Sequence, residues 1–276
     1  MDASATSPDP MAEIAERGLL LLGCGRMGSA MLRGWLAGGL PPGAVHVVDP
    51  DPSEWSRGLG LAAEPFRRPA VAVVAVKPQM MAEALPALAA HGGGDMLVVS
   101  VAAGVPLAAL ERALGPGTPV VRVMPNTPAA IGRGISAIVG NEAAGARGLS
   151  VAEALAAAVG RTVRLSSEEQ MDAVTAVSGS GPAYVFHLIE AMAAAGEAEG
   201  LPRDLATELA TATVAGAAAL AEGAERPAAE LRRDVTSPAG TTEAALRVLM
   251  DEERGLPPLM RRAVAAAAER SRELGR

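Results

Sequence analysis

Short aliphatic runs recur along the first part of the chain, and they predict buried β-strands. These runs occupy residues 19–22, 45–48, 71–76, 96–101 and 120–124, and two further strands are expected at 135–139 and 162–165. Most of the segments between them are compatible with helices. Because the strands are apolar on both faces, we expect a parallel sheet covered by helices on each side, as in a doubly wound α/β domain.

Beyond about residue 166 the strand-like runs stop, and the pattern predicts an all-α region. Prolines and glycines punctuate the expected helices near their ends, and these helices cover residues 182–200, 202–222, 241–252 and 257–273. Their alanine-rich faces carry enough apolar surface to favour burial against a second subunit.

Composition narrows the classes of partner. The formal net charge is -7 and no block rich in lysine or arginine occurs, which argues against nucleic acid and anionic membranes. The single cysteine, Cys24, cannot form an internal disulfide, and the three histidines lie too far apart in sequence to suggest a metal site. No apolar run approaches the roughly 20 residues that cross a bilayer, and the acidic N-terminal stretch resembles no targeting signal. We therefore expect a cytoplasmic protein that binds small molecules or copies of itself.

A glycine-rich loop follows the first predicted strand. Residues 23–28 read GCGRMG, and the segment 29–36 after them is compatible with a helix. In a dinucleotide site Gly23 would permit the tight turn, Gly25 would let the backbone approach a pyrophosphate, and Gly28 would let the helix pack on the sheet. The alternative is an ordinary glycine-rich turn between a strand and a helix.

Asp49 ends the second predicted strand, about 20 residues after the last glycine of the loop. An acid at this place accepts hydrogen bonds from the adenosine ribose and would repel a 2′-phosphate. NADH should then bind at least as readily as NADPH, although Arg57 can soften the preference by folding back. The alternative is a turn-forming aspartate before Pro50, without a role in binding.

Three further loops follow predicted strands and should reach the same crevice. Lys77, the only lysine of the chain, lies in the sequence VKPQ, and the segments 100–104 and 124–128 follow the next two strands. Asn126 and its small neighbours suit a nicotinamide carboxamide and ribose. The alternatives are chance survival of one lysine and prolines that only end strands.

Two hydroxyl-rich motifs lie in the helical part, at residues 178–184 and 236–242. Each places free backbone amides and the positive end of a helix dipole where a small carboxylate could bind without an arginine. As an alternative, Ser180 and Thr241 serve only as helix caps.

Taken together, these motifs resemble the pyrroline-5-carboxylate reductase family over nearly the whole chain from Leu19 onward. The segment 234–243, DVTSPAGTTE, is similar to the one that holds the substrate carboxylate in that family. The resemblance implies a flexible tail over 1–17, a Rossmann domain over 18–166, and a helical substrate-binding and dimerisation domain over 167–276. It also implies a homodimer or a ring of dimers that uses NADPH or NADH, and no metal, to reduce 1-pyrroline-5-carboxylate to L-proline, the last step of proline biosynthesis.

The resemblance assigns residues to two groups. Ser237 and the amides near Gly240 and Thr241 would hold the carboxylate, and the Thr242 hydroxyl would hydrogen-bond the ring nitrogen as the catalytic group. The cofactor residues would be Gly23, Gly25, Arg26, Met27, Gly28, Asp49, Ala75, Lys77, Pro78, Ala102, Gly104 and Asn126. Two positions depart from the family pattern: Ala239 stands where glycine is common, with the turn expected to stay intact, and Asp49 is unusual where NADPH is often favoured.

Two other function classes stay open. One is a related reductase, such as a 3-hydroxyacid dehydrogenase or a reductase for a different cyclic imine. Dehydrogenases of that build rely on a lysine in the helical domain, and no lysine occurs after Lys77. The other is a noncatalytic dinucleotide sensor, which would have no need of the hydroxyl cluster at 237–242.

Overall fold

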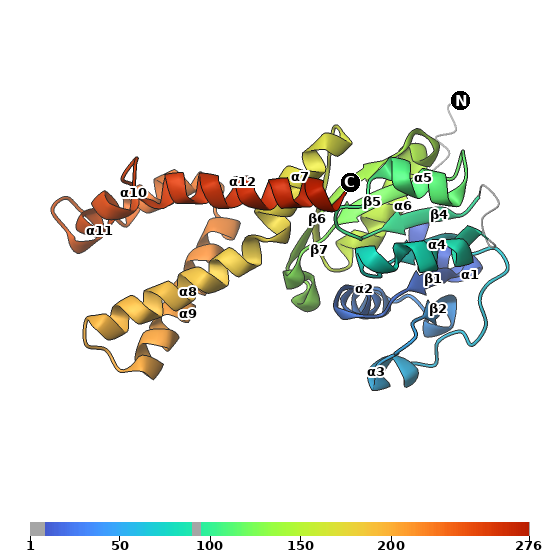
Figure 1. Cartoon of the computed structure of the whole chain (residues 1–276). Helices are drawn as coiled ribbons and strands as arrows, with labels where there is room; N and C mark the ends of the chain where they lie inside the picture. Colours follow the sequence, from blue (N-terminus) through green and yellow to red (C-terminus); the bar gives the residue numbers. More distant parts are fainter. Residues whose placement is uncertain (1–8, 90–94, 276) are drawn as a thin grey trace, which may run out of the picture. The chain divides into compact units, whose positions relative to one another are not determined.

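The computed structural model describes residues 9–89 and 95–275, and the chain divides into two compact units (Figure 1). The first unit comprises Met1–Gly179 together with Ala268–Arg276, and the second comprises Ser180–Ala267. The sequence-based division after residue 166 falls earlier. The pattern along the chain also gave no sign that the final turns of the last helix return to the first unit.

The first unit is built on one seven-stranded sheet, so the doubly wound α/β class is confirmed. Its strands are β1 (Leu19–Leu22), β2 (Val45–Val48), β3 (Val71–Val74), β4 (Leu97–Ser100), β5 (Val120–Met124), β6 (Gly134–Gly140) and β7 (Gly160–Arg164), in the order β2-β1-β3-β4-β5-β6-β7. One pairing departs from the expected parallel sheet, because β6 runs antiparallel to β5. The segment between them holds only a 3₁₀ turn, η3 (Thr127–Ile131), which is too short for a parallel crossover.

Helices of the first unit cover both faces of the sheet (Figure 1). They are α1 (Pro10–Arg17), α2 (Arg26–Ala37), α3 (Glu54–Arg57), α4 (Met81–Ala89), α5 (Leu107–Leu114), α6 (Gly145–Ala157) and α7 (Met171–Val174). Short 3₁₀ or π turns also occur at η1 (Pro42–Ala44), η2 (Pro78–Met80), η4 (Glu142–Ala144), η5 (Glu168–Gln170) and η6 (Thr175–Gly179).

Successive residues of the central strands face opposite sides of the sheet, as the period of two requires. In β1, Leu19 and Leu21 pack into one core cluster with residues of α1, α2 and α6. Leu20 and Leu22 pack into the other cluster with residues of α4 and α5. The strands are therefore apolar throughout because both faces are covered, which is the reason the sequence predicted.

The N-terminal segment is a correction to the sequence-based expectation. A flexible tail was expected over residues 1–17, but residues 10–17 form α1, and Ile14 is only 1% exposed. Asp9 caps this helix by accepting a hydrogen bond from the backbone N–H of Met11 at 3.0 Å. The short helix escaped the sequence reasoning because its apolar face is little more than Met11 and Ile14, too few residues for a periodic signal.

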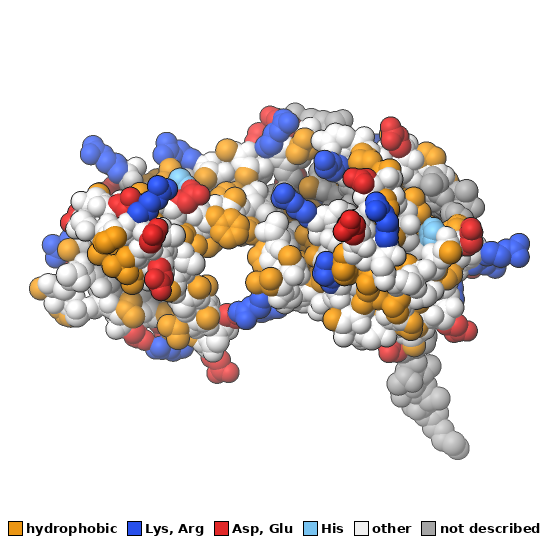
Figure 2. All heavy atoms as spheres, turned by 90° about the horizontal axis from the view of Figure 1, so that it is seen from below, with side chains coloured by type: hydrophobic (Ala, Val, Ile, Leu, Met, Phe, Trp, Pro, Cys, Tyr) orange, Lys and Arg blue, Asp and Glu red, His pale blue; other side chains and the backbone are white. Residues whose placement is uncertain are grey.

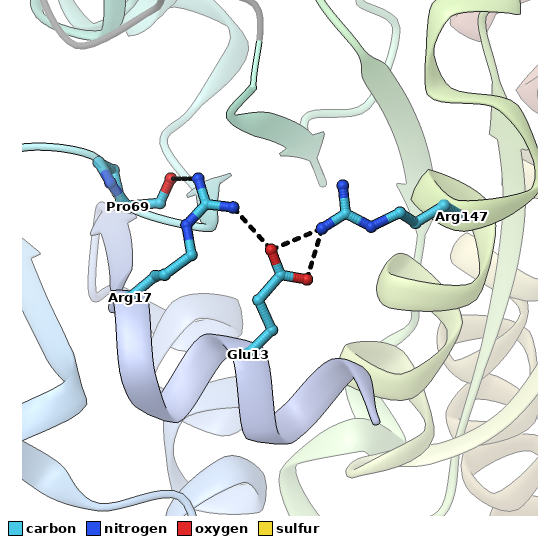
Figure 3. A network of polar contacts seen from close by, with 4 residues as sticks. All are labelled: Glu13, Arg17, Pro69 and Arg147. Carbon is cyan, nitrogen blue, oxygen red and sulfur yellow. Dashed lines mark hydrogen bonds and ion pairs between the residues drawn. The ribbon is translucent and has the colours of Figure 1, made fainter. Parts of the chain in front are cut away.

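An ion-pair network fastens α1 to the body of the unit (Figure 3). The Glu13 carboxylate lies between Arg17, at 2.6 Å on the same helix, and Arg147 of α6, at 2.5 Å. Burial alone would raise the pKa of Glu13, but its hydrogen bonds and charge interactions with Arg147 and Arg17 outweigh burial and lower that pKa. The ionised carboxylate is thus the form that holds α1 in place.

Replacing Glu13 by glutamine is expected to lower the free energy of unfolding by about 1 kcal/mol near pH 7. A carboxyl whose pKa is lowered by folding stabilises the protein above its unfolded pKa of about 4.3, and this contribution is lost as the pH falls through the folded value. The difference between variant and wild type should therefore shrink below about pH 4 in urea titrations. Glu16→Gln, on the exposed side of the same helix, is the matched control. An equal effect of both changes at pH 7 would contradict the role of the network.

The second unit is helical, with α8 (Gly181–Ala198), α9 (Arg203–Gly223), α10 (Ala228–Asp234), α11 (Thr241–Leu249) and most of α12 (Leu256–Leu274). Helix α10 was not expected from the sequence. The helices α8 and α9 pack through alanines, and the small core contains Ala193, Ala206 and Ala210. Large apolar side chains are left on the surface, among them Phe186 at 61% and Val248 at 72% exposure. Figure 2 shows such side chains on this unit, on the left.

No helix in the described ranges is long and apolar enough to cross a bilayer.

Candidate functional site

The loops that carry the predicted cofactor residues all follow the carboxyl ends of β1 to β5, within the first unit. These five strands are parallel, so their carboxyl ends share one edge of the sheet. Strands β2 and β3 lie on opposite sides of β1. The chain therefore adds strands on one side of β1 and then on the other. Open α/β sheets bind ligands at such a topological switch point.

The three glycines of the loop after β1 differ in their surroundings. Gly23 has a φ of 86°, and a Cβ there would lie 2.9 Å from the carbonyl oxygen of Ala75. A Cβ at Gly28 would collide with the carbonyl oxygen of Gly23, so glycine is needed where α2 approaches the loop. A Cβ at Gly25 would meet nothing within 4 Å, so this part of the backbone faces open space.

The N-terminus of α2 suits an anionic group. Gly25 is its N-cap and provides no capping side chain, and no acidic residue lies in the first turn. The backbone amides at this end are therefore available to a pyrophosphate, with the positive end of the helix dipole behind them. Arg26 is exposed at the first helical position, whereas Met27 is half-buried against the core. These residues fit the dinucleotide that the sequence predicted.

Asp49 lies directly beside this loop. Its Oδ2 accepts a hydrogen bond from the backbone N–H of Cys24 at 2.5 Å, and its Oδ1 accepts one from the N–H of Asp51 at 2.8 Å. Burial raises the pKa of the Cys24 thiol, the Asp49 carboxylate raises it further, and the opposing charge of Arg33 does not reverse this. The Cys24 side chain is thus a neutral thiol. Asp49 directly follows β2 and holds the glycine-rich loop through its hydrogen bond from Cys24.

The segment after β3 continues the same edge. Ala75 donates its backbone N–H to the carbonyl of Leu22 at 2.7 Å, which joins this segment to the end of β1. Lys77 follows on the exposed surface, and Pro78 begins η2. Among residues 9–89 and 95–275, Lys77 forms no ion pair.

The loops after β4 and β5 are built more tightly. Ala102 is 7% exposed. Gly104 has a φ of 76° and lies against Leu274. A Cβ added at Gly104 would be 3.0 Å from the Cβ of Leu274. Asn126 uses its side-chain oxygen to accept a hydrogen bond from the N–H of Ile135 at 3.0 Å. Asn126 therefore has a structural task, and its amide nitrogen can still donate to a cofactor.

The first hydroxyl-rich motif, residues 178–184, includes the point along the chain where the first unit ends and the second begins. Ser178 lies in the π-helical turn η6 and donates to the carbonyl of Val174 at 3.0 Å. Ser180 is the N-cap residue of α8 but makes no capping hydrogen bond. The interpretation of the Ser180 side chain as a helix cap is therefore wrong, because its hydroxyl does not bond the backbone of the helix.

The second motif curls over the start of α11. Gly240 is the N-cap and contributes no side chain, so Thr241 is the first helical residue and does not cap. The Ser237 hydroxyl lies so near Gly240 that a Cβ there would collide with its Oγ. Thr242, half-buried, is the second helical residue. The structure thus brings the four predicted substrate residues together within one turn.

Ala239 adopts the left-handed conformation, with a φ of 55°, and is the only non-glycine residue with positive φ in the described ranges. Its backbone N–H donates to Glu243 Oε2 at 2.5 Å, which ties the turn to the first turn of α11. The turn is present as expected, but alanine in this conformation costs roughly 1 kcal/mol relative to glycine.

Two contacts within the first unit were missed by the sequence reasoning. The Arg33 guanidinium of α2 stacks over the Trp55 ring of α3 at 3.6 Å, and nothing in the sequence joins positions so far apart. Arg122, 8% exposed on β5, pairs with Glu168 at 2.5 Å. Here a signal existed, because a lone arginine inside an apolar strand requires a buried partner.

Comparison with known proteins assigns both parts of the chain. Residues 168–274 match the domain family described as pyrroline-5-carboxylate reductase dimerisation. Residues 19–104 match the domain family described as NADP oxidoreductase, coenzyme F420-dependent.

Full-length relatives and solved structures agree with these matches. The chain is 42% identical to a pyrroline-5-carboxylate reductase of Pseudomonas aeruginosa, covering 93% of this chain and 96% of that protein. It is 40% identical to one of Methanosarcina acetivorans, covering 92% and 97%. The structure of a pyrroline-5-carboxylate reductase from Coxiella burnetii superposes with a TM-score of 0.87 at 33% identity, over 94% and 99% of the two chains. That of the Plasmodium falciparum enzyme with NADP bound superposes with a TM-score of 0.82 at 27% identity, over 95% and 99%.

Proposed function

The chain belongs to the pyrroline-5-carboxylate reductase family, and from this premise we propose which of its residues carry the reaction. The protein is an NAD(P)H-dependent oxidoreductase that reduces 1-pyrroline-5-carboxylate to L-proline, the last step of proline biosynthesis. One observation carries the residue assignment: the cofactor loops and the hydroxyl-rich turn before α11 occur in the same chain, each with its binding groups free.

When bound, NAD(P)H supplies a hydride to the imine carbon of the substrate. The first unit holds the cofactor. The amides at the N-terminus of α2 bind the pyrophosphate, Gly25 lets the backbone approach it, and Asp49 accepts hydrogen bonds from the adenosine ribose. Lys77, Ala102 and the Asn126 amide nitrogen line the side toward the nicotinamide.

The turn before α11 binds the substrate carboxylate. The Ser237 hydroxyl donates one hydrogen bond, and the backbone N–H groups of Thr241 and Thr242, which have no partner within the helix, donate the others. The nearby acid, Glu243, is already engaged by the Ala239 N–H and by Arg247 at 3.0 Å. Its negative charge is thereby offset, and the dipole of α11 favours the carboxylate.

The Thr242 hydroxyl hydrogen-bonds the ring nitrogen of the substrate. As the carbon accepts the hydride, that nitrogen takes up one proton, supplied by solvent, and becomes an amine, so a hydrogen bond fixed on the nitrogen stabilises the transition state. Neither a nucleophile nor a metal enters this chemistry, and the protein acts through position and hydrogen bonding.

The protein is a homo-oligomer, and the finer proposal is a homodimer that alone or in a ring of dimers buries the apolar surface of α8 to α12. The match to a dimerisation domain and the exposure of Phe186 and Val248 support it. We place this oligomer in the cytoplasm. Light scattering that gave the mass of one chain would contradict the dimer.

Ser237→Ala is expected to raise the KM for pyrroline-5-carboxylate about 10-fold, because a hydrogen bond to a charged group contributes about 1.5 to 3 kcal/mol. The KM for NAD(P)H should stay the same, since the hydroxyl lies in the helical unit. Ser150→Ala, which removes a hydroxyl bonded on α6, is the control and should change neither constant. An unchanged KM for the substrate in Ser237→Ala would remove this hydroxyl from the site.

A further inference from the structure

The final turn of α12 lies against the loop that follows β4. From Ala268 onward this helix belongs to the first unit. A Cβ at Gly104 would lie 3.0 Å from the Cβ of Leu274, and a Cβ at Gly275 would lie 2.8 Å from the carbonyl oxygen of Gly104. Both distances show that the backbone of the loop is in close contact with the end of the helix. The conformation of this loop therefore depends on where the end of α12 lies.

A buried serine fixes the end of α12. Ser271 is 5% exposed, and its hydroxyl donates to Asp172 Oδ1 of α7 at 2.6 Å. A serine within a helix often donates to a carbonyl of the preceding turn, but this hydroxyl joins two residues that are 99 positions apart. A hydrogen bond to a carboxylate is shorter and stronger than one between neutral groups. Ser271 therefore holds the last turn of α12 to α7.

The end of the same loop is held by a neighbouring segment. Pro106 is the N-cap of α5 and makes no side-chain capping hydrogen bond. Glu168 of η5 serves instead, because its Oε1 accepts from the Leu107 N–H at 2.7 Å and from the Arg122 guanidinium at 2.5 Å. Glu168 and Asp172 lie close together in the sequence. One short segment of the chain thus supports both the end of the loop and the helix that touches its middle.

Packing does not replace these polar contacts. A cavity of about 330 Å³ lies beside the loop, and its wall includes Gly104, Pro106, Asp172 and Ser271. Most of the described residues that line it are polar or charged. Without the hydrogen bond of Ser271, the end of α12 has space into which it can shift, and the loop loses the neighbour that fixes it.

We propose that Ser271 is a positioning residue for the cofactor: by holding the end of α12, it keeps the loop after β4 in the conformation that receives the nicotinamide half. This inference rests on the proposed function, because it assumes that the loop after β4 binds the cofactor. Ser271 touches neither cofactor nor substrate and acts through Gly104. The pyrophosphate and the adenosine bind at the loop after β1 and the end of β2, so their binding does not depend on Ser271.

Binding of the whole cofactor and of a fragment, without the imine substrate, tests this inference. The whole cofactor is NADH or NADPH, whichever the wild type binds more tightly, and the fragment is ADP, which lacks the nicotinamide and its ribose. We expect Ser271→Ala to raise the Kd for the reduced cofactor about 10-fold, measured by nicotinamide fluorescence. The Kd for ADP, measured by calorimetry, should stay the same. A general weakening of the first unit would instead raise both constants.

Variants of Asp172 show whether the hydrogen bond is responsible. Asp172→Ala should raise the Kd for the reduced cofactor as Ser271→Ala does, and the double variant should add nothing further. Asp172→Asn keeps an oxygen that accepts from the Ser271 hydroxyl and should bind the cofactor nearly as the wild type does. Glu273→Ala is the control, because it removes an exposed side chain of the same turn whose ion pair, with Arg270, stays within α12. It should change neither constant.

Wild-type affinity for the reduced cofactor in folded Ser271→Ala and Asp172→Ala would overturn the inference. An equal loss of affinity for the cofactor and for ADP would overturn it as well, because it would show a structural role alone. Failure of the proposed function is distinguishable from both results, since the wild type itself would then oxidise no cofactor in the presence of the imine. A wild type that bound neither NADH nor NADPH would contradict the proposed function and the inference together.

Discussion

Gly28→Ala should lower the affinity for NAD(P)H by more than about 100-fold, which corresponds to about 3 kcal/mol, and should destabilise the first unit by a similar amount. A Cβ at this position would collide with the carbonyl oxygen of Gly23, and both atoms belong to backbone that cannot rotate away. Helix α2 would have to move off the sheet, and the amides that hold the pyrophosphate would move with it. Cofactor titration and thermal unfolding measure the two effects.

Variants at two other glycines distinguish a loss of cofactor binding from a loss of stability. Gly25→Ala places a methyl group where nothing lies within 4 Å, so the protein should fold as the wild type does while the cofactor loses its close approach to the backbone. Gly43→Ala also meets nothing within 4 Å, lies away from the loop, and should change neither property. Wild-type cofactor affinity in Gly28→Ala or Gly25→Ala would show that the dinucleotide does not bind at this loop.

Thr242→Val should lower kcat roughly 10- to 100-fold while leaving cofactor affinity nearly intact. The change keeps the shape of the side chain and removes the hydroxyl that hydrogen-bonds the ring nitrogen, and such a contact contributes about 1 to 3 kcal/mol to the transition state. Steady-state kinetics with saturating cofactor measure the loss. Thr211→Val, whose hydroxyl bonds only the carbonyl of Thr207 within α9, is the matched control. An unchanged turnover would remove Thr242 from the mechanism.

The sequence predicted the parts of the fold that depend on local pattern. The strands β1, β2 and β5 occur at the predicted residues because each is an apolar run bounded by turn residues. The order of loops along a parallel sheet then placed the glycine loop, Lys77 and Asn126 at one edge without any knowledge of their contacts.

Most of the features that the sequence did not predict depend on contacts between distant segments. The hydrogen bond from Cys24 to Asp49 and the stacking of Arg33 on Trp55 each join positions on different elements. The antiparallel direction of β6 follows from the short connection before it, and its apolar pattern gives no sign of direction. Helix α1 is fixed by the partners of Glu13 more than by its own periodicity.

The most direct test of the proposed reaction is oxidation of NADH and NADPH by the purified protein, with and without 1-pyrroline-5-carboxylate. We expect cofactor oxidation that depends on the imine, with L-proline as the product. Absence of imine-dependent oxidation with either cofactor, from protein shown to be folded and to bind the dinucleotide, would contradict it.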